Sequence, residues 1–204
     1  TYMYRSFFRV KDEFLKLYVP GDLRGKLFFK SGSFAGAFYN YPNKQASSAG
    51  GEFSDTYGLR LPEAYLNKAE ALAMLGKDAD AIRLLKELRA KRFSDKSGGD
   101  INKSGEDLVN FVRTERRLEF TFEGHRWFDL RRYAVNPKYP FETSIRHPYY
   151  EDGSAVTLGD MVLGKYSEEP AAWVMLIPES EITENEGALV QNEERQERQP
   201  VSKE

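Results

Sequence analysis

The sequence predicts a mainly α-helical fold, in which helical hairpins are joined to irregular loops and a few short strands. Residues 59–92 contain no proline after Pro62 and are rich in Ala, Leu, Glu, Lys and Arg, which favour helices. Residues 104–122 carry apolar side chains at helical spacing. Elsewhere the chain is interrupted by most of its nine prolines and sixteen glycines, which favour loops over long helices.

The composition is that of a folded, aqueous chain. The 204 residues are 14% aromatic and carry a net charge of −2, which excludes a disordered chain. A nucleic-acid binder is also excluded, because such proteins need an excess of Lys and Arg. The absence of cysteine excludes disulfides, thiolate zinc sites and cysteine nucleophiles. The longest apolar run, residues 171–177, is far shorter than the roughly 20 residues of a membrane helix.

Residues 1–58 are predicted to form loops and short strands that face a ligand. This stretch is aromatic and glycine-rich and has no helical period. Short strands are expected at residues 2–10 and 26–30, with a turn at Pro20-Gly21 and a long loop between residues 31 and 51.

Residues 59–134 are predicted to form a helical scaffold that begins with two antiparallel helices. The first is expected to start at Pro62, a favourable first-turn residue, and to end at Leu75. Gly76 follows as the glycine that terminates it. The second helix is expected over residues 78–92, where apolar side chains recur at helical spacing.

Two further helices are expected to complete the scaffold. The first begins after Ser104, whose hydroxyl is expected to cap it, and continues to Phe122. Glu106 and Asp107 then face the positive end of the helix dipole. A short helix is expected over residues 127–133.

The remainder of the chain is predicted to contain little regular structure. Residues 135–192 are expected to form a loop-rich region that packs on the helices, because Pro137, Pro140, Pro148 and Pro170 exclude any long helix. One strand is expected at residues 173–177. Residues 193–204 are charged and have no apolar period, so they are expected to be a frayed tail.

The first helical hairpin fits the tetratricopeptide template, a repeat of two antiparallel helices. When Ala81 is placed at the small residue that opens the second helix, Ala69 falls where the helices touch and Gly76 falls on the turn. The large positions are then filled by Tyr65, Leu72, Leu85 and Leu88. Because one hairpin cannot bury both of its faces, the helices at residues 104–133 are expected to stack on it. A helical hairpin without repeat ancestry remains the alternative.

The predicted helices have broad apolar faces, and they are too few to bury all of these faces against one another. An exposed apolar patch is therefore expected, with Leu61, Tyr65 or Leu72 among its members. If the chain is part of a longer protein, preceding helices would pack on this patch.

Two glutamates fall on the apolar face of the helix predicted at residues 104–122. At about 100° per residue, Glu115 and Glu119 lie in the middle of the apolar stripe. A carboxylate that faces a core needs cations and hydrogen-bond donors around it. The candidate cations are Lys68, Arg89, Arg92, Arg126, Arg131 and Arg132.

This glutamate pair has two interpretations. Carboxylates four residues apart on a helix lie roughly 6 Å apart, close to the spacing that a retaining glycosidase uses. The alternative is a buried ion-pair network, in which the arginines keep both carboxylates ionised and leave no acid with a raised pKa. We favour the network. His125 is interpreted as a hydrogen-bonding residue, and with His147 as the only other histidine no metal cluster is expected.

The chain resembles the SusD/RagB family. The run Glu115–Phe120 followed by Phe122–Arg132 is similar to the family's most characteristic stretch nearly throughout. Supporting pieces occur in the family's order, namely Asp22-Leu23-Arg24, Arg60–Leu66, Ala69-Glu70-Ala71, Leu88–Arg92, Leu176–Ile182 and Val190-Gln191-Asn192. The resemblance spans most of positions 20–192.

The resemblance implies that the charged motif is structural and not a binding site. The residues expected to form a structural ion-pair motif are Glu115, Arg116, Arg117, Glu119, Glu123, Arg126, Asp129 and Arg131.

The resemblance also implies a function. Family members are glycan-binding lipoproteins of the bacterial cell surface, so it implies an oligosaccharide or polysaccharide ligand and a TonB-dependent outer-membrane barrel as partner in uptake. It implies a surface-exposed place at the outer membrane, anchored by a lipid on a cysteine that this chain lacks. No catalysis, cofactor or nucleic-acid ligand is expected. The alternatives are a glycoside hydrolase that uses Glu115 and Glu119, or a tetratricopeptide-type protein-interaction module.

Candidate sugar-binding residues follow from sugar chemistry, because sugar rings stack on aromatic side chains and their hydroxyls bond polar ones. The first group lies in the loop at residues 33–45 and comprises Phe34, Phe38, Tyr39, Asn40, Tyr41, Asn43 and Gln45. The second group comprises Tyr149, Tyr150 and Asp152. The alternative is that these aromatic residues pack the non-helical half of the protein.

Overall fold

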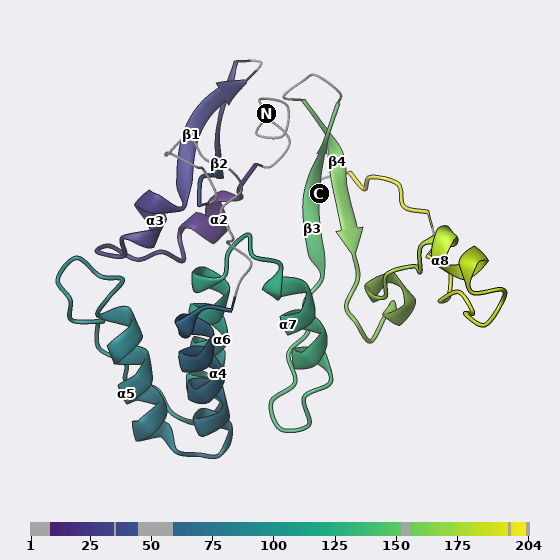
Figure 1. Cartoon of the computed structure of the whole chain (residues 1–204). Coiled ribbons are helices and arrows are strands. Elements are labelled where there is room, and N and C mark those ends of the chain that lie inside the picture. Colours follow the sequence, from purple (N-terminus) through teal and green to yellow (C-terminus); the bar gives the residue numbers. More distant parts are fainter. Residues whose placement is uncertain (1–8, 35, 45–58, 152–155, 196, 203–204) are drawn as a thin grey trace. The chain divides into compact units, whose positions relative to one another are not determined.

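The structure is a computed structural model that describes residues 9–34, 36–44, 59–151, 156–195 and 197–202. It divides into two compact units, Thr1–Arg126 and Trp127–Glu204 (Figure 1). The helices are α2 (Asp12–Leu15), α3 (Arg24–Leu27), α4 (Leu61–Met74), α5 (Asp78–Arg89), α6 (Gly105–Glu119), α7 (His125–Ala134), α8 (Glu179–Glu184) and the 3-10 helix η1 (Pro170–Trp173). The strands are β1 (Phe29–Phe34), β2 (Ala37–Pro42), β3 (Ile145–Tyr150) and β4 (Thr157–Leu163). The predicted mainly α-helical fold with a few short strands is confirmed.

Helices α4 and α5 form the predicted antiparallel hairpin. Gly76 has a φ of +72°, a left-handed conformation that glycine adopts without strain. The amide of Lys77 donates to the carbonyl of Leu72, and that of Gly76 donates to Ala73. These two bonds form a Schellman motif, which satisfies carbonyls at the end of the helix.

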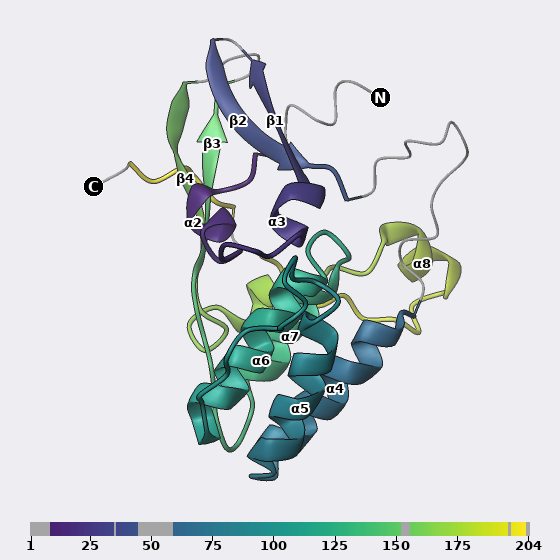
Figure 2. The same ribbon diagram turned by 90° about the vertical axis from the view of Figure 1, so that its left-hand side faces the viewer.

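Helix α6 packs against this hairpin, so three helices lie side by side in the first unit (Figures 1 and 2). Ala69 and Ala81 are fully buried, which lets the α4 and α5 backbones approach closely. The third helix therefore stacks on the hairpin as the repeat template predicts.

The two ends of α6 differ from the prediction. Ser104 is the N-cap residue but makes no capping hydrogen bond with its side chain. Instead, the amide of Gly105 donates to Oδ2 of Asp78, a residue in the first turn of α5, at 3.1 Å. The helix ends at Glu119 and not at residue 122, because the backbone leaves the helical conformation at Phe120, which has a ψ of +24°, and Phe122 is left-handed with a φ of +64°.

The N-terminal elements are fixed to the C-terminal end of α6. The hydroxyl of Tyr18 donates to the carbonyl of Leu118 at 3.0 Å. The rings of Phe14, Tyr18 and Phe29 meet edge to face, with centroids 5.3 to 6.1 Å apart. This cluster holds α2 and the start of β1 against the helices.

Two predicted strands in this region are corrected. Residues 26–30 do not form one strand, because α3 occupies residues 24–27 and β1 begins at Phe29. Most of the strand predicted at residues 2–10 lies outside the described residues, although Val10 makes a β-bridge with Asn40.

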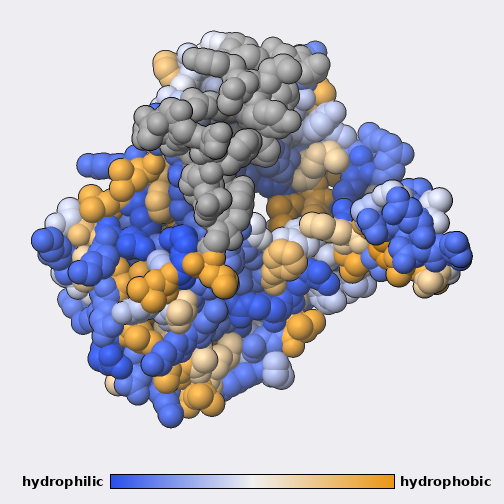
Figure 3. Space-filling view, viewed as in Figure 1, coloured by the Kyte–Doolittle hydropathy of each residue, from blue (hydrophilic) through white to orange (hydrophobic). Residues whose placement is uncertain are grey.

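One side of α4 leaves apolar side chains exposed. Leu61 is 70% exposed and Leu75 is 72% exposed, while Tyr65 and Leu72 are half-buried. Figure 3 shows hydrophobic surface among hydrophilic atoms over the region of α4 and α5. The expected exposed patch is thus confirmed for Leu61.

The second unit contains the antiparallel β3–β4 hairpin, η1 and α8. Trp173 is buried, donates from Nε1 to the carbonyl of Gly164 at 3.0 Å, and stacks on Trp127 with centroids 5.0 Å apart. The expected tail at residues 193–204 is not frayed in its described part. Val201 exchanges two backbone hydrogen bonds with Asp160 of β4.

The strand predicted at residues 173–177 is wrong. Residues 174–177 have no strand partner in the described chain, because side chains satisfy their backbone groups instead. Gln191 both accepts from the amide of Ile177 and donates to its carbonyl, and Asn192 donates to the carbonyl of Met175. Among the described residues, no helix is long and apolar enough to cross a membrane.

Candidate functional site

The charged motif of α6 forms a buried ion-pair network. Glu115 and Glu119 are each 1% exposed, as the helical phase predicts. Arg24 lies between them, with Nη2 2.6 Å from Glu115 and Nη1 3.2 Å from Glu119. Its Nε and Nη2 groups also donate to Asp22 at 3.0 and 2.7 Å. A single arginine from the N-terminal segment therefore meets three carboxylates.

Further cations complete this network. Arg92 donates to both oxygens of Glu119 at 2.8 Å, and Arg89 forms an ion pair with Glu115. Arg60 donates to Glu119 at 3.2 Å and to Glu123 at 2.7 Å. Lys44 also forms an ion pair with Glu123. Among the described residues the network thus joins four carboxylates, Asp22, Glu115, Glu119 and Glu123, to five cations, Arg24, Arg60, Arg89, Arg92 and Lys44.

The network keeps Glu119 ionised. Burial alone would raise the pKa of Glu119, but the hydrogen bond from Arg92 and the charges of Arg92, Arg24 and Arg60 outweigh it and lower the pKa. A general acid needs the opposite shift and access to substrate. The arrangement around Glu115 and Glu119 therefore supports structure and not acid–base catalysis.

The other motif residues have varied roles. Arg116 donates to Asn67 at 2.7 Å, and Asp129 pairs with Arg132 at 2.9 Å. The prediction that Arg117 belongs to the ion-pair motif is wrong. In the described structure its guanidinium lies over the ring of Phe14, 4.6 Å from the centroid, and meets no carboxylate. Arg126 and Arg131 are half-buried on α7.

The cations predicted to pair with Glu115 and Glu119 are only partly those found in the structure. Arg89 and Arg92 pair with the glutamates as expected, whereas Lys68 is exposed on α4. The list missed Arg24 and Arg60, which come from segments distant in sequence. The one feature of the sequence that pointed to Arg24 is that Asp22-Leu23-Arg24 is among the segments that resemble the family.

The β1–β2 hairpin divides the first group of sugar-binding candidates between its two faces. Tyr39 and Tyr41 lie on one face, opposite Gly32 and Lys30 respectively, with ring centroids 5.9 Å apart. A Cβ on Gly32 would lie 3.1 Å from the ring of Tyr41, so glycine makes room for the rings. The guanidinium of Arg9 lies 5.3 Å from the centroid of Tyr39. This face is a half-buried aromatic surface with cations beside it.

The other face carries Phe38 and Asn40. Phe38 is 89% exposed near the turn, and Asn40 accepts a hydrogen bond from the hydroxyl of Ser31 at 2.8 Å. Asn43 lies just beyond β2 and is used structurally, because its side chain donates to the carbonyl of Leu27 at 3.2 Å. Phe34 pairs with Ala37 in the register, and Gln45 lies outside the described residues.

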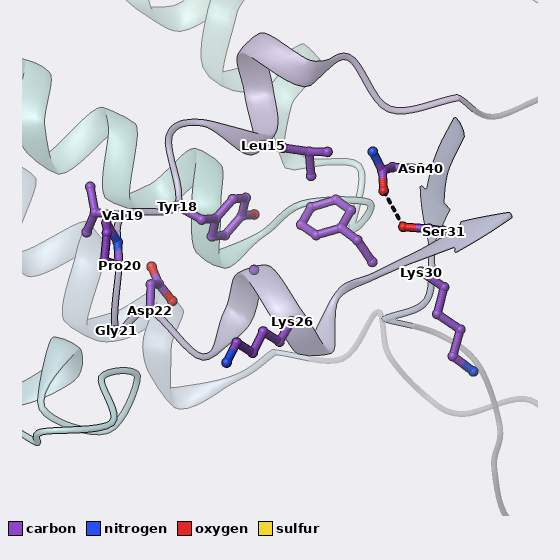
Figure 4. Close-up of a pocket in the computed structure, with 12 residues that line it drawn as sticks. Leu15, Tyr18, Val19, Pro20, Gly21, Asp22, Lys26, Lys30, Ser31 and Asn40 are labelled. Atoms are coloured by element: carbon purple, nitrogen blue, oxygen red, sulfur yellow. Dashed lines mark hydrogen bonds between the residues drawn. The ribbon is translucent and has the colours of Figure 1, made fainter. Parts of the chain in front are cut away.

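A depression of about 580 Å³ lies beside this second face (Figure 4). Its apolar wall includes Leu15, Tyr18 and Phe29, and burial raises the pKa of Tyr18 to about 12. Its polar lining comprises Asp22, Lys26, Lys30, Ser31 and Asn40. Of these polar residues, Asn40 alone is a candidate predicted from the sequence.

The second group of candidates lies on the β3–β4 hairpin. Tyr149 is 47% exposed and pairs with Gly159, while Tyr150 is half-buried and pairs with Thr157. The register of β3 with β4 shifts between the two tyrosines, so the pairing is irregular at this point. Asp152 lies outside the described residues. In the described chain, no group of three or more His, Asp or Glu side chains is placed to hold a metal ion.

Comparison with known proteins decides the family. A sequence model of the SusD family matches residues 29–194, which include β1, β2, α4, α5, α6 and most of the second unit. The chain belongs to the SusD family. A SusD-like protein of Formosa agariphila is 38% identical over 77 residues, which are 35% of this chain and 15% of that protein.

Two solved SusD structures from Bacteroides vulgatus share the fold. One, a SusD superfamily protein, has a TM-score of 0.57 and 25% identity over 87% of this chain. The other, described as a SusD-like carbohydrate binding protein, has a TM-score of 0.50 and 27% identity over 78% of this chain. The matched regions cover 36% and 33% of those two chains, so this SusD chain spans about a third of their length.

Proposed function

We propose that the chain binds glycans at the β1–β2 hairpin and acts without catalysis. The observation that carries this proposal is the pair Tyr39 and Tyr41 over Gly32, in a family with a member described as a carbohydrate binding protein. Aromatic rings on a firm strand can stack on the apolar faces of sugars at low entropic cost. Asn40 and Ser31 on the opposite face offer hydrogen bonds to sugar hydroxyls.

The proposal extends to the setting in which the protein works. We propose that the whole protein captures oligosaccharide at the cell surface, is lipid-anchored in the outer membrane, and passes its ligand to a TonB-dependent barrel. The support for this setting is membership of the SusD family alone.

Two results of the structure argue against the alternative functions. The glutamates that a hydrolase would use are buried and ion-paired with arginines. A protein-interaction module would bind peptide through its helices, whereas the candidate aromatic residues lie on the hairpins.

Affinity electrophoresis through gels containing purified polysaccharides tests this proposal. We expect at least one glycan to retard the protein. In a Tyr39→Ala/Tyr41→Ala variant the binding free energy should be weaker by about 1–3 kcal/mol, the scale for losing aromatic contact area. A Phe128→Ala variant is the matched control, because Phe128 is an exposed aromatic residue outside both hairpins. Retention of full affinity by the double tyrosine variant would contradict this location, and absence of retardation by every glycan would contradict the function.

A further inference from the structure

The segment that carries the β1–β2 hairpin is more positive than the rest of the chain. Residues 9–44 contain seven cationic and three acidic side chains, a net charge of +4, whereas the whole chain has a net charge of −2. No acidic residue occurs between Asp22 and Glu52. Arg24 and Lys44 of this segment are already paired with Glu115, Glu119 and Glu123, so the positive charge available to attract an anionic ligand is smaller and lies on exposed side chains such as Lys26 and Lys30.

Two exposed lysines of this segment line the depression. Lys26 comes from α3 and Lys30 from β1, and within the described part of the chain neither makes an ion pair. The one acidic residue in the lining, Asp22, is buried and pairs with Arg24 at 2.7 Å. The lining therefore includes two lysines without an ion pair among the described residues, and its carboxylate is already neutralised.

The two lysines are directed differently. Figure 4 shows Lys26 extending towards the side of Asp22, whereas Lys30 projects from the strand away from Tyr18. The register also pairs Lys30 with Tyr41, at the edge of the aromatic face. One small anion would meet only one of these ammonium groups. Because Lys30 shares the face of the tyrosines and Lys26 lies beside the depression at the other face, only a polymer with anionic groups on successive sugars that reaches both faces can meet both lysines and contact the tyrosines.

We propose that the hairpin binds an anionic polysaccharide, whose carboxylate or sulfate groups pair with Lys26 and Lys30 while its rings contact Tyr39 and Tyr41. This inference rests on the proposed function and names the ligand class for the same site. Lysine is a mobile point charge, so it suits a row of anions better than one planar group.

The test compares four polymers in affinity electrophoresis or calorimetry: a polyuronate, a sulfated polysaccharide, a neutral glucan and duplex DNA. We expect the 204-residue chain to prefer an anionic polymer, and the two anionic arms tell carboxylate from sulfate. A Lys26→Gln/Lys30→Gln variant should bind that polymer about tenfold more weakly. A Lys68→Gln/Lys77→Gln variant, which removes the same charge from exposed positions at α4 and before α5, is the control and should bind like the wild type.

Three outcomes would overturn the inference. Equal loss of binding in both lysine variants would mean that net charge matters and not this site, and equal binding of duplex DNA would indicate attraction to any polyanion. Binding of neutral glucan alone, lost in the tyrosine variant and unchanged in both lysine variants, would contradict the anionic ligand but support the proposed function. Failure to bind any polysaccharide would contradict the proposed function itself.

Discussion

Replacing Glu119 by alanine should strongly destabilise the first unit. Glu119 accepts two hydrogen bonds from Arg92 at 2.8 Å, and Arg24 and Arg60 each donate to it at 3.2 Å. The Arg24 side chain is only 2% exposed, so it cannot turn to water when the carboxylate is removed. It does keep Asp22 and Glu115 as partners.

The size of this effect follows from leaving buried cations without one of their carboxylates. Removing one partner of a buried pair costs about 3–5 kcal/mol. For a chain of this length, that loss lowers the melting temperature by about 6–20 °C. Removing an exposed partner costs far less, at most about 1 kcal/mol.

Urea unfolding followed by circular dichroism measures the difference. Glu87→Ala is the matched control, because Glu87 pairs with Arg83 at 3.0 Å on α5 and both side chains are exposed. We expect Glu119→Ala to lower the urea midpoint strongly with an unchanged slope, and Glu87→Ala to leave the midpoint nearly unchanged. Similar midpoints for the two variants would mean that the network does not hold the first unit together.

Three further predictions concern stability and association. Folding lowers the pKa of Glu119, so the stability that its carboxylate contributes should be complete at neutral pH and decline as the pH falls below about 4.5. The urea midpoint of Glu119→Gln should therefore depend less on acid pH than the wild-type midpoint does. Equal acid dependence of the two midpoints would contradict the pKa shift. Asp78→Ala should cost about 1 kcal/mol because the amide of Gly105 loses its acceptor, whereas Asp80→Ala, in the same helical turn, should cost less; equal losses would assign the effect to the dipole of α5. Leu61→Lys should reduce self-association in size-exclusion chromatography, and a chain that is already monomeric would show that the exposed α4 surface does not self-associate.

The helical part of the fold could be predicted because its signals are local. The spacing of apolar residues gave the approximate extents of α4, α5 and α6, and Gly76 marked the turn where a left-handed residue is needed. The same helical phase predicted that Glu115 and Glu119 face the core. Burial of both side chains confirms that phase.

Two partners of those glutamates, Arg24 and Arg60, were not predicted, because they come from segments distant in sequence. Arg24 lies 95 residues from Glu119 and Arg60 lies 59 residues from it, and no local pattern relates such positions. Likewise, nothing in residues 174–177 shows that Gln191 will satisfy the backbone there in place of a strand. The capping of α6 by Asp78 of α5 is also a tertiary contact.

The candidate site was predicted by residue type and not by arrangement. Treating residues 33–45 as a loop grouped Tyr39 with Asn40, whereas a strand places neighbours on opposite faces. The depression beside β1 had no sequence signal, since its lining combines α2, α3 and both strands.

An NMR titration of the isotope-labelled chain with an oligosaccharide tests the central claim most directly. The claim is that glycan contacts the β1–β2 hairpin while the buried network only supports the fold. We predict that backbone shifts change with ligand at residues 30–41 and stay constant at Glu115 and Glu119. Shift changes that are largest at the two glutamates, with none in the hairpin, would contradict the account.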